Sequence, residues 1–120
     1  MNDKPLISII LGTRPEAIKL APLILCFKEC KKFKTRIILT GQHKEIVFNV
    51  MKLFCLKADN DLNLMKDNQT LTDISSAILN GLKEEFASYK PDLVLVQGDT
   101  SSAFISALAA FYEKIPVGHV

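Results

Sequence analysis

The sequence has little excess of charge of one sign and no long hydrophobic run. Its 15 lysines and arginines stand against 13 acidic residues, a net charge of +2. The one dense run of cations, residues 28–36, is typical of the solvated end of a helix, so no nucleic-acid partner is expected. The first apolar run, of about six residues, is too short for a signal-peptide core or a membrane span. We therefore expect a cytoplasmic location and no membrane partner.

Cysteine and histidine are also scarce. The three cysteines, Cys26, Cys30 and Cys55, cannot all pair, and Cys26 and Cys30 lack the spacing of a zinc or redox motif. We interpret the cysteines as reduced packing residues of a cytosolic protein. Neither histidine, His43 or His119, forms a set with metal-ligand spacing together with cysteines or carboxylates. No metal and no other cofactor is expected.

The sequence does contain an alternation of buried-strand and amphipathic-helix patterns. Strands are predicted at 6–11, 35–40, 61–65, within 92–100 and from 115, and helices at 17–27, 46–54, 70–90 and 101–114. Pro22 removes one hydrogen bond from the first helix, which predicts a kink near 18–22. Thr70, followed three residues later by Asp73, predicts a capped helix start.

These elements predict an α/β protein with a Rossmann-like doubly wound parallel sheet. Right-handed crossovers between parallel strands leave little other choice, and the chain has no internal repeats. The helix at 101–114 is apolar nearly all round, which predicts burial on more than one side. Because the chain stops within a strand, we expect residues 1–120 to be a partial N-terminal domain that something else covers.

Three strands are followed by a glycine and then by polar residues. These strand exits read Gly12-Thr13-Arg14, Gly41-Gln42-His43 and Gly98-Asp99-Thr100. In open α/β sheets, ligands bind beyond the carboxyl ends of the strands, and glycine lets the backbone approach a ligand closely. We therefore look for the chemistry of this protein at these exits.

The first exit suits an anion. Gly12 is expected to give a tight turn, and Thr13 to cap the next helix while Glu16 reaches back. The unpaired N–H groups of the helix start favour an anion; Arg14 adds a planar fork of donors and Lys19 a point charge. The segment has neither the G-x-G-x-x-G spacing nor a following G-K-[ST], so it is neither a dinucleotide fingerprint nor a P-loop. It predicts a diphosphate site, the alternative being a capped helix start with two surface cations.

The other exits each offer one candidate. Asp99 leaves the central strand near the switch point, where it is either an acid or base facing a sugar or the cap of the helix that begins at Thr100. His43 is either a substrate-binding residue or a loop or cap residue. His119 is interpreted as a structural histidine with its hydrogen bonds satisfied.

Five segments together resemble the N-terminal part of bacterial non-hydrolysing UDP-N-acetylglucosamine 2-epimerases over nearly all of the chain. They are GTRPEAIKLAPL, TGQHKEIV, DLNLM, LVLVQGDT and ALAAFYEKIPVGHV. Their combination is highly specific, although no single segment is. The wording GTRPEAIK favours the non-hydrolysing branch, because hydrolysing relatives usually do not keep it.

The resemblance implies an incomplete N-terminal half of a GT-B-like fold, with the C-terminal domain absent from residues 1–120. It implies an enzyme that interconverts UDP-N-acetylglucosamine and UDP-N-acetylmannosamine by elimination and re-addition of UDP. In the family, a further active-site glutamate, another carboxylate, a histidine and most of the uridine-diphosphate pocket lie beyond the matching segments. We therefore expect the 120 residues alone to lack useful epimerase activity.

The resemblance also implies roles for individual residues. Arg14 and Lys19 carry over as charge-stabilising contacts to the ligand, and Asp99 as an acid/base or substrate-orienting carboxylate. His43 is a weaker substrate-binding candidate. The implied partners are a UDP-sugar, a second copy in a homodimer and a complementing C-terminal chain. The family's products usually go to surface polysaccharides.

Two other functions stay open. One is a non-catalytic module that binds a complementing chain through the helix Ser101 to Tyr112. The other is the N-terminal half of a GT-B glycosyltransferase. UDP binding that Arg14→Ala abolishes would favour the epimerase half. Self-association without nucleotide binding would favour the module, and acceptor-dependent sugar transfer would favour the transferase.

Overall fold

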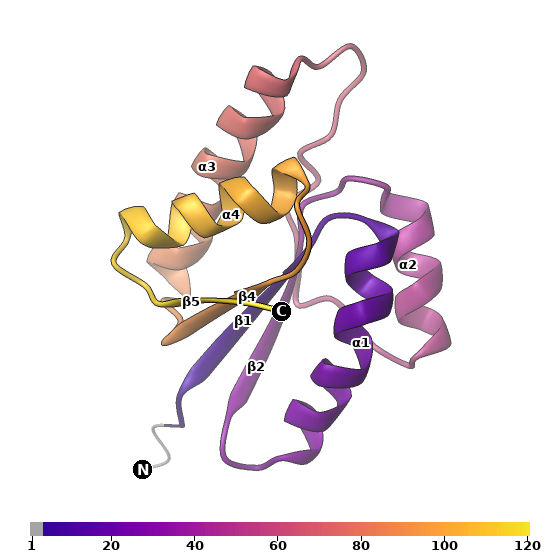
Figure 1. Cartoon of the computed structure of the whole chain (residues 1–120), viewed down its shortest axis with the longest axis vertical. Helices are drawn as coiled ribbons and strands as arrows, with labels where there is room; N and C mark the ends of the chain where they lie inside the picture. Colours follow the sequence, from indigo (N-terminus) through magenta and orange to yellow (C-terminus); the bar gives the residue numbers. More distant parts are fainter. Residues whose placement is uncertain (1–3) are drawn as a thin grey trace.

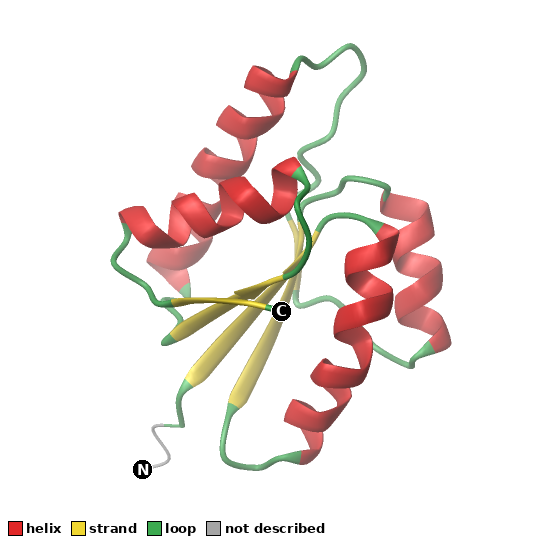
Figure 2. Ribbon diagram, in the orientation of Figure 1, coloured by secondary structure: helices red, strands yellow, loops and turns green. Residues whose placement is uncertain are grey.

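The computed structural model describes residues 4–120 and shows a five-stranded parallel sheet with helices on both faces (Figures 1 and 2). The strands are β1 Leu6–Leu11, β2 Lys34–Leu39, β3 Asn60–Asp61, β4 Leu93–Val96 and β5 Val117–His119. The helices are α1 Arg14–Glu29, α2 Lys44–Leu53, α3 Leu71–Ser88 and α4 Ser101–Tyr112. The order β3-β2-β1-β4-β5, with every pair parallel, confirms the predicted doubly wound Rossmann-like sheet. Its topological switch point lies between β1 and β4.

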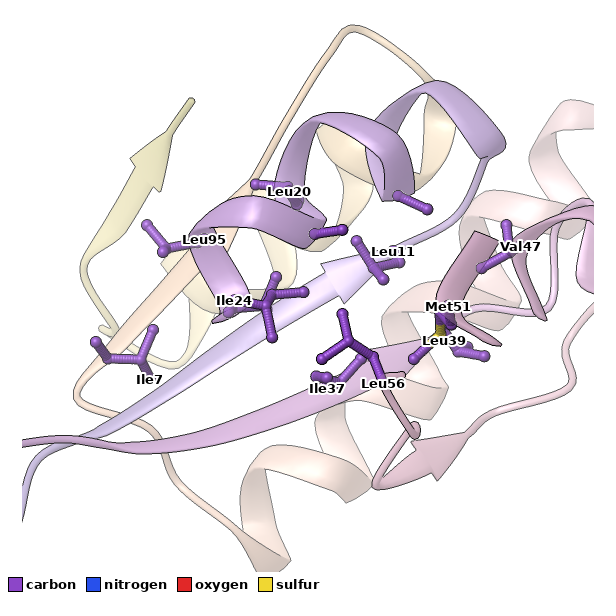
Figure 3. Close-up of a cluster of buried hydrophobic side chains, with 13 residues drawn as sticks. Ile7, Leu11, Leu20, Ile24, Ile37, Leu39, Val47, Met51, Leu56 and Leu95 are labelled. Atoms are coloured by element: carbon purple, nitrogen blue, oxygen red, sulfur yellow. The ribbon is translucent and has the colours of Figure 1, made fainter. Parts of the chain in front are cut away.

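The two faces of the sheet have separate cores. Alternate residues of β1, Ile7, Ile9 and Leu11, pack with α1 and α2 on one face (Figure 3), whereas Ile10 packs with α3 and α4 on the other. Side chains of a strand point alternately to opposite faces, so a strand covered on both sides needs a continuous apolar run. The run at 6–11 is therefore read correctly as a strand buried on both faces.

The helix boundaries follow local chemistry. α1 begins at Arg14, three residues before the predicted start, because Pro15 suits a first turn whose N–H groups have no helical partner. The helix continues through Pro22, whose side chain is exposed. At the start of α3, the Thr70 hydroxyl accepts from the Asp73 amide at 3.1 Å and the Asp73 carboxylate accepts from the Thr70 amide at 3.0 Å. The predicted capping arrangement at Thr70 is confirmed.

The predicted strand at 61–65 is wrong in its extent. β3 comprises only Asn60–Asp61, because Asn63 takes a positive φ of 51° and turns the chain. Leu62 and Leu64 lie on either side of this turn and both pack against the core under α3 and α4. The alternation of apolar and polar residues therefore reports burial of two leucines and not a continuing strand.

The cysteines do not pack in the core as predicted. Cys26 and Cys55 are exposed and Cys30 is half-buried, all three as free thiols. Lys31, Lys32 and their lysine neighbours in the cationic run are exposed, as expected, but Arg36 at its end is half-buried. The side chains of the run thus change from exposed to half-buried where β2 enters the sheet.

The last helix is buried where it faces the sheet and where it packs against α3. Its outer side presents Phe104, Phe111 and Tyr112, which are 65%, 72% and 62% exposed in this chain. The expected burial of α4 on more than one side is therefore confirmed for the sheet and α3, but its outer side is not covered by residues 4–120. In the same part of the chain, every helix is too short or too polar to cross a membrane.

Candidate functional site

The parallel order of the strands gathers the three glycine-led exits at one edge of the sheet. β1 and β4 are neighbours, so their exits lie on the two sides of the switch point, and β2 adjoins β1. Arg14 is the first residue of α1 and is exposed, as is Lys19 one turn later. Asp99 is exposed in the turn between β4 and α4. The structure thus places Arg14 and Asp99 at adjacent exits, on the two sides of the switch point.

Glu16 connects several residues at this edge of the sheet. Its side chain is buried, with the residue only 1% exposed, in the first turn of α1. Oε1 accepts from the Gly12 amide at 3.1 Å, and Oε2 accepts from the hydroxyls of Thr13 at 2.5 Å and Thr100 at 2.9 Å. The carboxylate therefore joins the exit of β1 to the start of α4 across the switch point.

The expected arrangement of Thr13 and Glu16 is confirmed in part: Glu16 reaches back, to the Gly12 amide, but the Thr13 side chain does not cap the helix. Thr13 is the N-cap of α1, but its side chain accepts no capping hydrogen bond. Its hydroxyl instead donates to Glu16, and the Thr13 carbonyl accepts from the Ala17 amide at 3.1 Å. The Thr13 hydroxyl therefore satisfies the buried carboxylate and not an amide of the helix start.

The turn that carries Asp99 is held at both ends. Thr100, and not Asp99, is the N-cap of α4, and its hydroxyl accepts from the Ala103 amide at 3.1 Å. The alternative role of Asp99 as a helix cap is therefore wrong. Gly98 has a positive φ of 86°, and its carbonyl lies 2.8 Å from Nε2 of His119. This contact confirms that His119 has a structural hydrogen bond.

Gly12 is required for packing and not for a left-handed turn. A Cβ built on Gly12 would overlap the side chain of Ser102 and lie 3.2 Å from Oγ1 of Thr40. Ser102 is buried in α4, and its hydroxyl donates to Oε1 of Gln42 at 2.6 Å. The absence of a side chain at Gly12 thus lets α4 come close to β1 at its exit.

His43 lies at the exit of β2 and is exposed. It is the N-cap of α2, has a φ of 53° and makes no side-chain cap hydrogen bond. The structure describes no contact that ties His43 to Arg14 or Asp99. His43 is thus one strand further from the switch point than the other candidates.

The two cations of the first exit are not committed to a carboxylate. Within residues 4–120 the ion pairs are Arg36 with Glu85 and Lys44 with Asp61, and neither involves Arg14 or Lys19. In the described part of the chain there is also no group of three or more histidine, cysteine or acidic side chains placed to hold a metal ion. The arrangement suits an anionic ligand held by side-chain cations, beside an exposed carboxylate.

Glu16 is the residue whose importance the sequence does not reveal. Its position three residues after Thr13 predicts a local cap partner. The contact that makes it central comes from Thr100, 84 residues further along the chain. No local spacing carries that information.

The sequence profile of the UDP-N-acetylglucosamine 2-epimerase family matches residues 25–120. The chain is 50% identical over 111 residues to UDP-N-acetylglucosamine 2-epimerase of Escherichia coli K12, and 49% identical over 111 residues to that of Neisseria meningitidis serogroup A. These alignments cover 92% of this chain and 30% of each relative.

Solved structures agree. The chain superposes with a TM-score of 0.90 and 47% identity on UDP-GlcNAc 2-epimerase from Neisseria meningitidis bound to UDP-GlcNAc, over 96% of this chain and 31% of that one. A second UDP-N-acetylglucosamine 2-epimerase gives a TM-score of 0.93 at 47% identity, over 98% of this chain and 33% of that one. The chain thus spans about a third or less of the length of the relatives that it matches. By sequence and by fold, it belongs to the UDP-N-acetylglucosamine 2-epimerase family.

Proposed function

We propose that the chain supplies the N-terminal half of the substrate site of a non-hydrolysing UDP-N-acetylglucosamine 2-epimerase, which interconverts UDP-N-acetylglucosamine and UDP-N-acetylmannosamine. The observation that carries the proposal is the placement of Arg14 and Asp99 at adjacent strand exits on the two sides of the switch point. A relative of 47% identity with the same fold has been solved with UDP-GlcNAc bound. Ligands of open α/β sheets bind at this position.

The proposed reaction explains the types of residue present. The proton on sugar carbon 2 is not adjacent to a carbonyl group, so its direct removal is unfavourable. Loss of that proton together with cleavage of the bond from carbon 1 to UDP gives a glycal and UDP. UDP then adds back to carbon 1 while a proton reaches the opposite face of carbon 2. Such a route needs cations for the departing diphosphate and carboxylates that move protons.

In this route Arg14 and Lys19 bind the diphosphate and stabilise the charge that develops on it. Asp99 acts on the sugar as one acid/base or orienting carboxylate, and His43 is a further substrate contact. Neither cation shares an ion pair in residues 4–120, so both are available to a ligand. No cofactor takes part in this proposal.

The proposal extends to the rest of the molecule. Residues 1–120 form a partial N-terminal Rossmann-like domain of a GT-B-like enzyme, and a C-terminal part completes the cleft. We expect no useful epimerisation by residues 1–120 alone, a cytoplasmic location, homodimers of the full-length enzyme, and neither nucleic-acid nor membrane partners. A contribution to surface polysaccharide synthesis follows from the product.

A chimera tests the reaction. Residues 1–120 replace the matching N-terminal part of the Escherichia coli relative, which is 50% identical over the aligned segment. Formation of UDP-N-acetylmannosamine is followed by NMR. We expect an active chimera in which Asp99→Asn lowers kcat by about 100-fold or more, because an acid/base group contributes about that much. Asp67→Asn, at an exposed loop position, is the matched control.

Binding tests the first exit in the same chimera. We expect Arg14→Ala to weaken UDP binding by about tenfold or more, since hydrogen bonds from a charged group to an anion are strong. Lys32→Ala removes an exposed cation from the loop before β2, at the opposite edge of the sheet, and should leave UDP affinity unchanged. An active chimera that tolerates both Asp99→Asn and Arg14→Ala would overturn the proposed roles.

A second candidate function has one observation in its favour. The outer side of α4 exposes Phe104, Phe111 and Tyr112, and exposed apolar side chains that gather on one surface mark interaction sites. On this account the chain is a non-catalytic module that binds a complementing chain. Sedimentation of the chain alone separates the two functions: association that Phe104→Ser and Phe111→Ser abolish, without UDP binding, would favour the module.

A further inference from the structure

One oxygen atom of Glu16 serves two separate parts of the site. Oε2 accepts hydrogen bonds from the hydroxyls of Thr13, at the exit of β1, and Thr100, at the exit of β4. Thr13 directly precedes Arg14, and Thr100 directly follows Asp99. The two residues that the proposed function assigns to the ligand are therefore each one peptide bond away from a hydroxyl bound to the same atom.

The contacts of Glu16 require a carboxylate. All three partners donate, the Gly12 amide to Oε1 and two hydroxyls to Oε2, and an ionised carboxyl group only accepts. A glutamine in its place has one accepting oxygen and one donating amide. If its amide nitrogen faced the Gly12 N–H, a donor would meet a donor. If it faced the two hydroxyls, they would have to accept instead of donate, and their protons would lose the charged acceptor that they have in Glu16.

Few other contacts hold the turn between β4 and α4. The carbonyl of Gly98 meets His119, and the Thr100 hydroxyl accepts from the Ala103 amide while donating to Glu16. The side chain of Asp99 is exposed between these two fixed points. Loss of the bond to Glu16 removes the contact that joins this turn to the exit of β1.

We infer that Glu16 is a positioning residue, which holds Arg14 and Asp99 in one fixed arrangement across the switch point without touching the ligand. The inference rests on the proposed function, in which these two residues meet the UDP-sugar. Binding groups that are held in place before the ligand arrives cost less ordering on binding. Glu16 thus acts on ligand affinity through Thr13 and Thr100.

Hydrogen exchange of the full chain tests the coupling without any ligand. The Ala103 amide is informative, because it donates to Thr100 and does not contact Glu16. In Glu16→Gln we expect the Gly12 and Ala103 amides to exchange about tenfold faster or more, because a buried contact is lost locally. The Ile37 amide, which donates to Asp59, is the control and should keep its rate. An unchanged Ala103 rate, or equal acceleration at Ile37, would overturn the inference.

A rescue experiment tests the effect on the ligand, with UDP as the probe and the chimera with the Escherichia coli relative as the protein. Thr100→Val removes the hydroxyl that donates to Glu16, and Thr100→Ser keeps it. We expect Glu16→Gln and Thr100→Val each to weaken UDP binding by about tenfold, while Thr100→Ser stays within about twofold of the parent. Equal affinities of Thr100→Val and Thr100→Ser would overturn the inference. If the parent chimera does not bind UDP, the proposed function fails, whereas the exchange rates still decide the coupling.

Discussion

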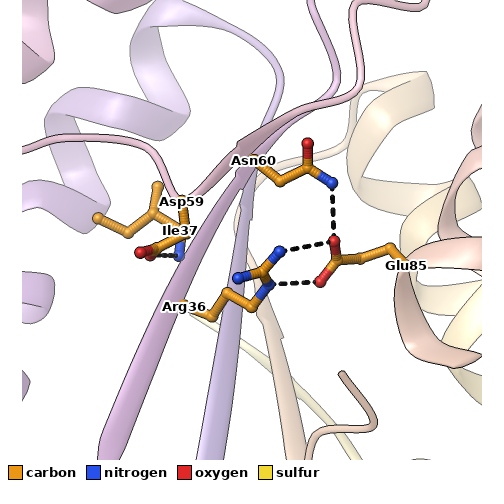
Figure 4. A network of polar contacts seen from close by, with 5 residues as sticks. All are labelled: Arg36, Ile37, Asp59, Asn60 and Glu85. Atoms are coloured by element: carbon orange, nitrogen blue, oxygen red, sulfur yellow. Dashed lines mark hydrogen bonds and ion pairs between the residues drawn. The ribbon is translucent and has the colours of Figure 1, made fainter. Parts of the chain in front are cut away.

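Glu16 and Glu85 are the two buried carboxylates of residues 4–120, 1% and 4% exposed, and their surroundings differ. Glu85 of α3 meets a full positive charge: Arg36 Nε lies 2.6 Å from Oε2 and Nη2 lies 3.1 Å from Oε1 (Figure 4). Asn60 donates to the same Oε1 at 2.7 Å. Glu16 is bound instead by two hydroxyls and one backbone amide, without a cation among its described contacts.

This difference in partners distinguishes a carboxylate with a structural role, Glu85, from a carboxylate beside a proposed binding site, Glu16. The Glu85 hydrogen bond raises the pKa of the Arg36 guanidinium above its ordinary value, and the guanidinium also lies 3.7 Å from the centre of the Tyr89 ring. Arg36 is thus fully engaged within the fold, between β2 and α3. Arg14 and Lys19 near Glu16 are exposed and share no ion pair in the described residues. A buried carboxylate satisfied by neutral donors leaves the neighbouring cations to a ligand.

The largest expected effect comes from breaking the charged pair. Arg36→Met should lower the free energy of unfolding by about 3 kcal/mol, because it leaves the charge of Glu85 buried and unpaired. Both side chains are largely buried, at 16% and 1% exposure, so solvent screens the pair little. Urea unfolding measures the loss.

Two further variants sharpen this result. Lys34→Met removes an exposed cation from the same strand and should change the free energy of unfolding by less than about 0.5 kcal/mol. Arg36→Met combined with Glu85→Leu should recover part of the loss, since no charge then stays unpaired. If Arg36→Met alone unfolds at the same urea midpoint as the parent, burial of the Glu85 carboxylate does not require the charge of Arg36.

The next largest effect concerns the close packing of Gly12 against Ser102, beside the Glu16 carboxylate. Gly12→Ala should destabilise the fold by about 2 kcal/mol, because its Cβ overlaps Ser102 and helix α4 must move. The double variant Gly12→Ala with Ser102→Gly should lose less than the sum of the two single losses. Strict additivity in urea unfolding would show that the two residues do not meet.

Much of the fold could be predicted because its signals are local. Apolar runs and helical spacing identify the long elements, and the crossover rule then leaves one class of sheet. The sequence predicts Asp99 near the switch point. The strand order, which the sequence does not predict, places the exit of Asp99 beside that of Arg14. Their roles on a ligand stay predictions.

Long-range contacts could not be predicted from spacing. The bond from Thr100 to Glu16 spans 84 residues, and the pair of Arg36 with Glu85 spans 49. Arg36 ends a run of cations that looks solvated, and only its position within β2 brings it against α3. The partners of both buried carboxylates are therefore known only once the strand order places distant segments side by side.

A third carboxylate, that of Asp73, extends the comparison of Glu16 and Glu85 to an exposed position, where the expected effect on stability is smaller. The hydrogen bond from the Thr70 amide to the Asp73 carboxylate, and then the Thr70 side chain, lower the pKa of exposed Asp73 below its ordinary value of 3.8. A lowered folded-state pKa gives stability that is present above pH 3.8 and is lost as the pH falls through the folded-state value. The stability difference between the parent and Asp73→Asn should therefore shrink below pH 3.8 in thermal unfolding. A difference that stays constant to pH 2.5 would contradict the assignment.

The smallest expected effect on stability is at the proposed ligand cation. Arg14→Ala should change the free energy of unfolding by less than about 0.5 kcal/mol, because the side chain is exposed and has no ion pair in the described residues. The same substitution should weaken UDP binding in the chimera, so affinity and stability separate at this residue. Arg36→Met should do the reverse, with a large loss of stability and little change in UDP affinity below the unfolding transition. If Arg14→Ala instead destabilises the chain as much as Arg36→Met does, Arg14 belongs to the fold, and the contrast between the two carboxylates no longer separates a structural contact from a binding site.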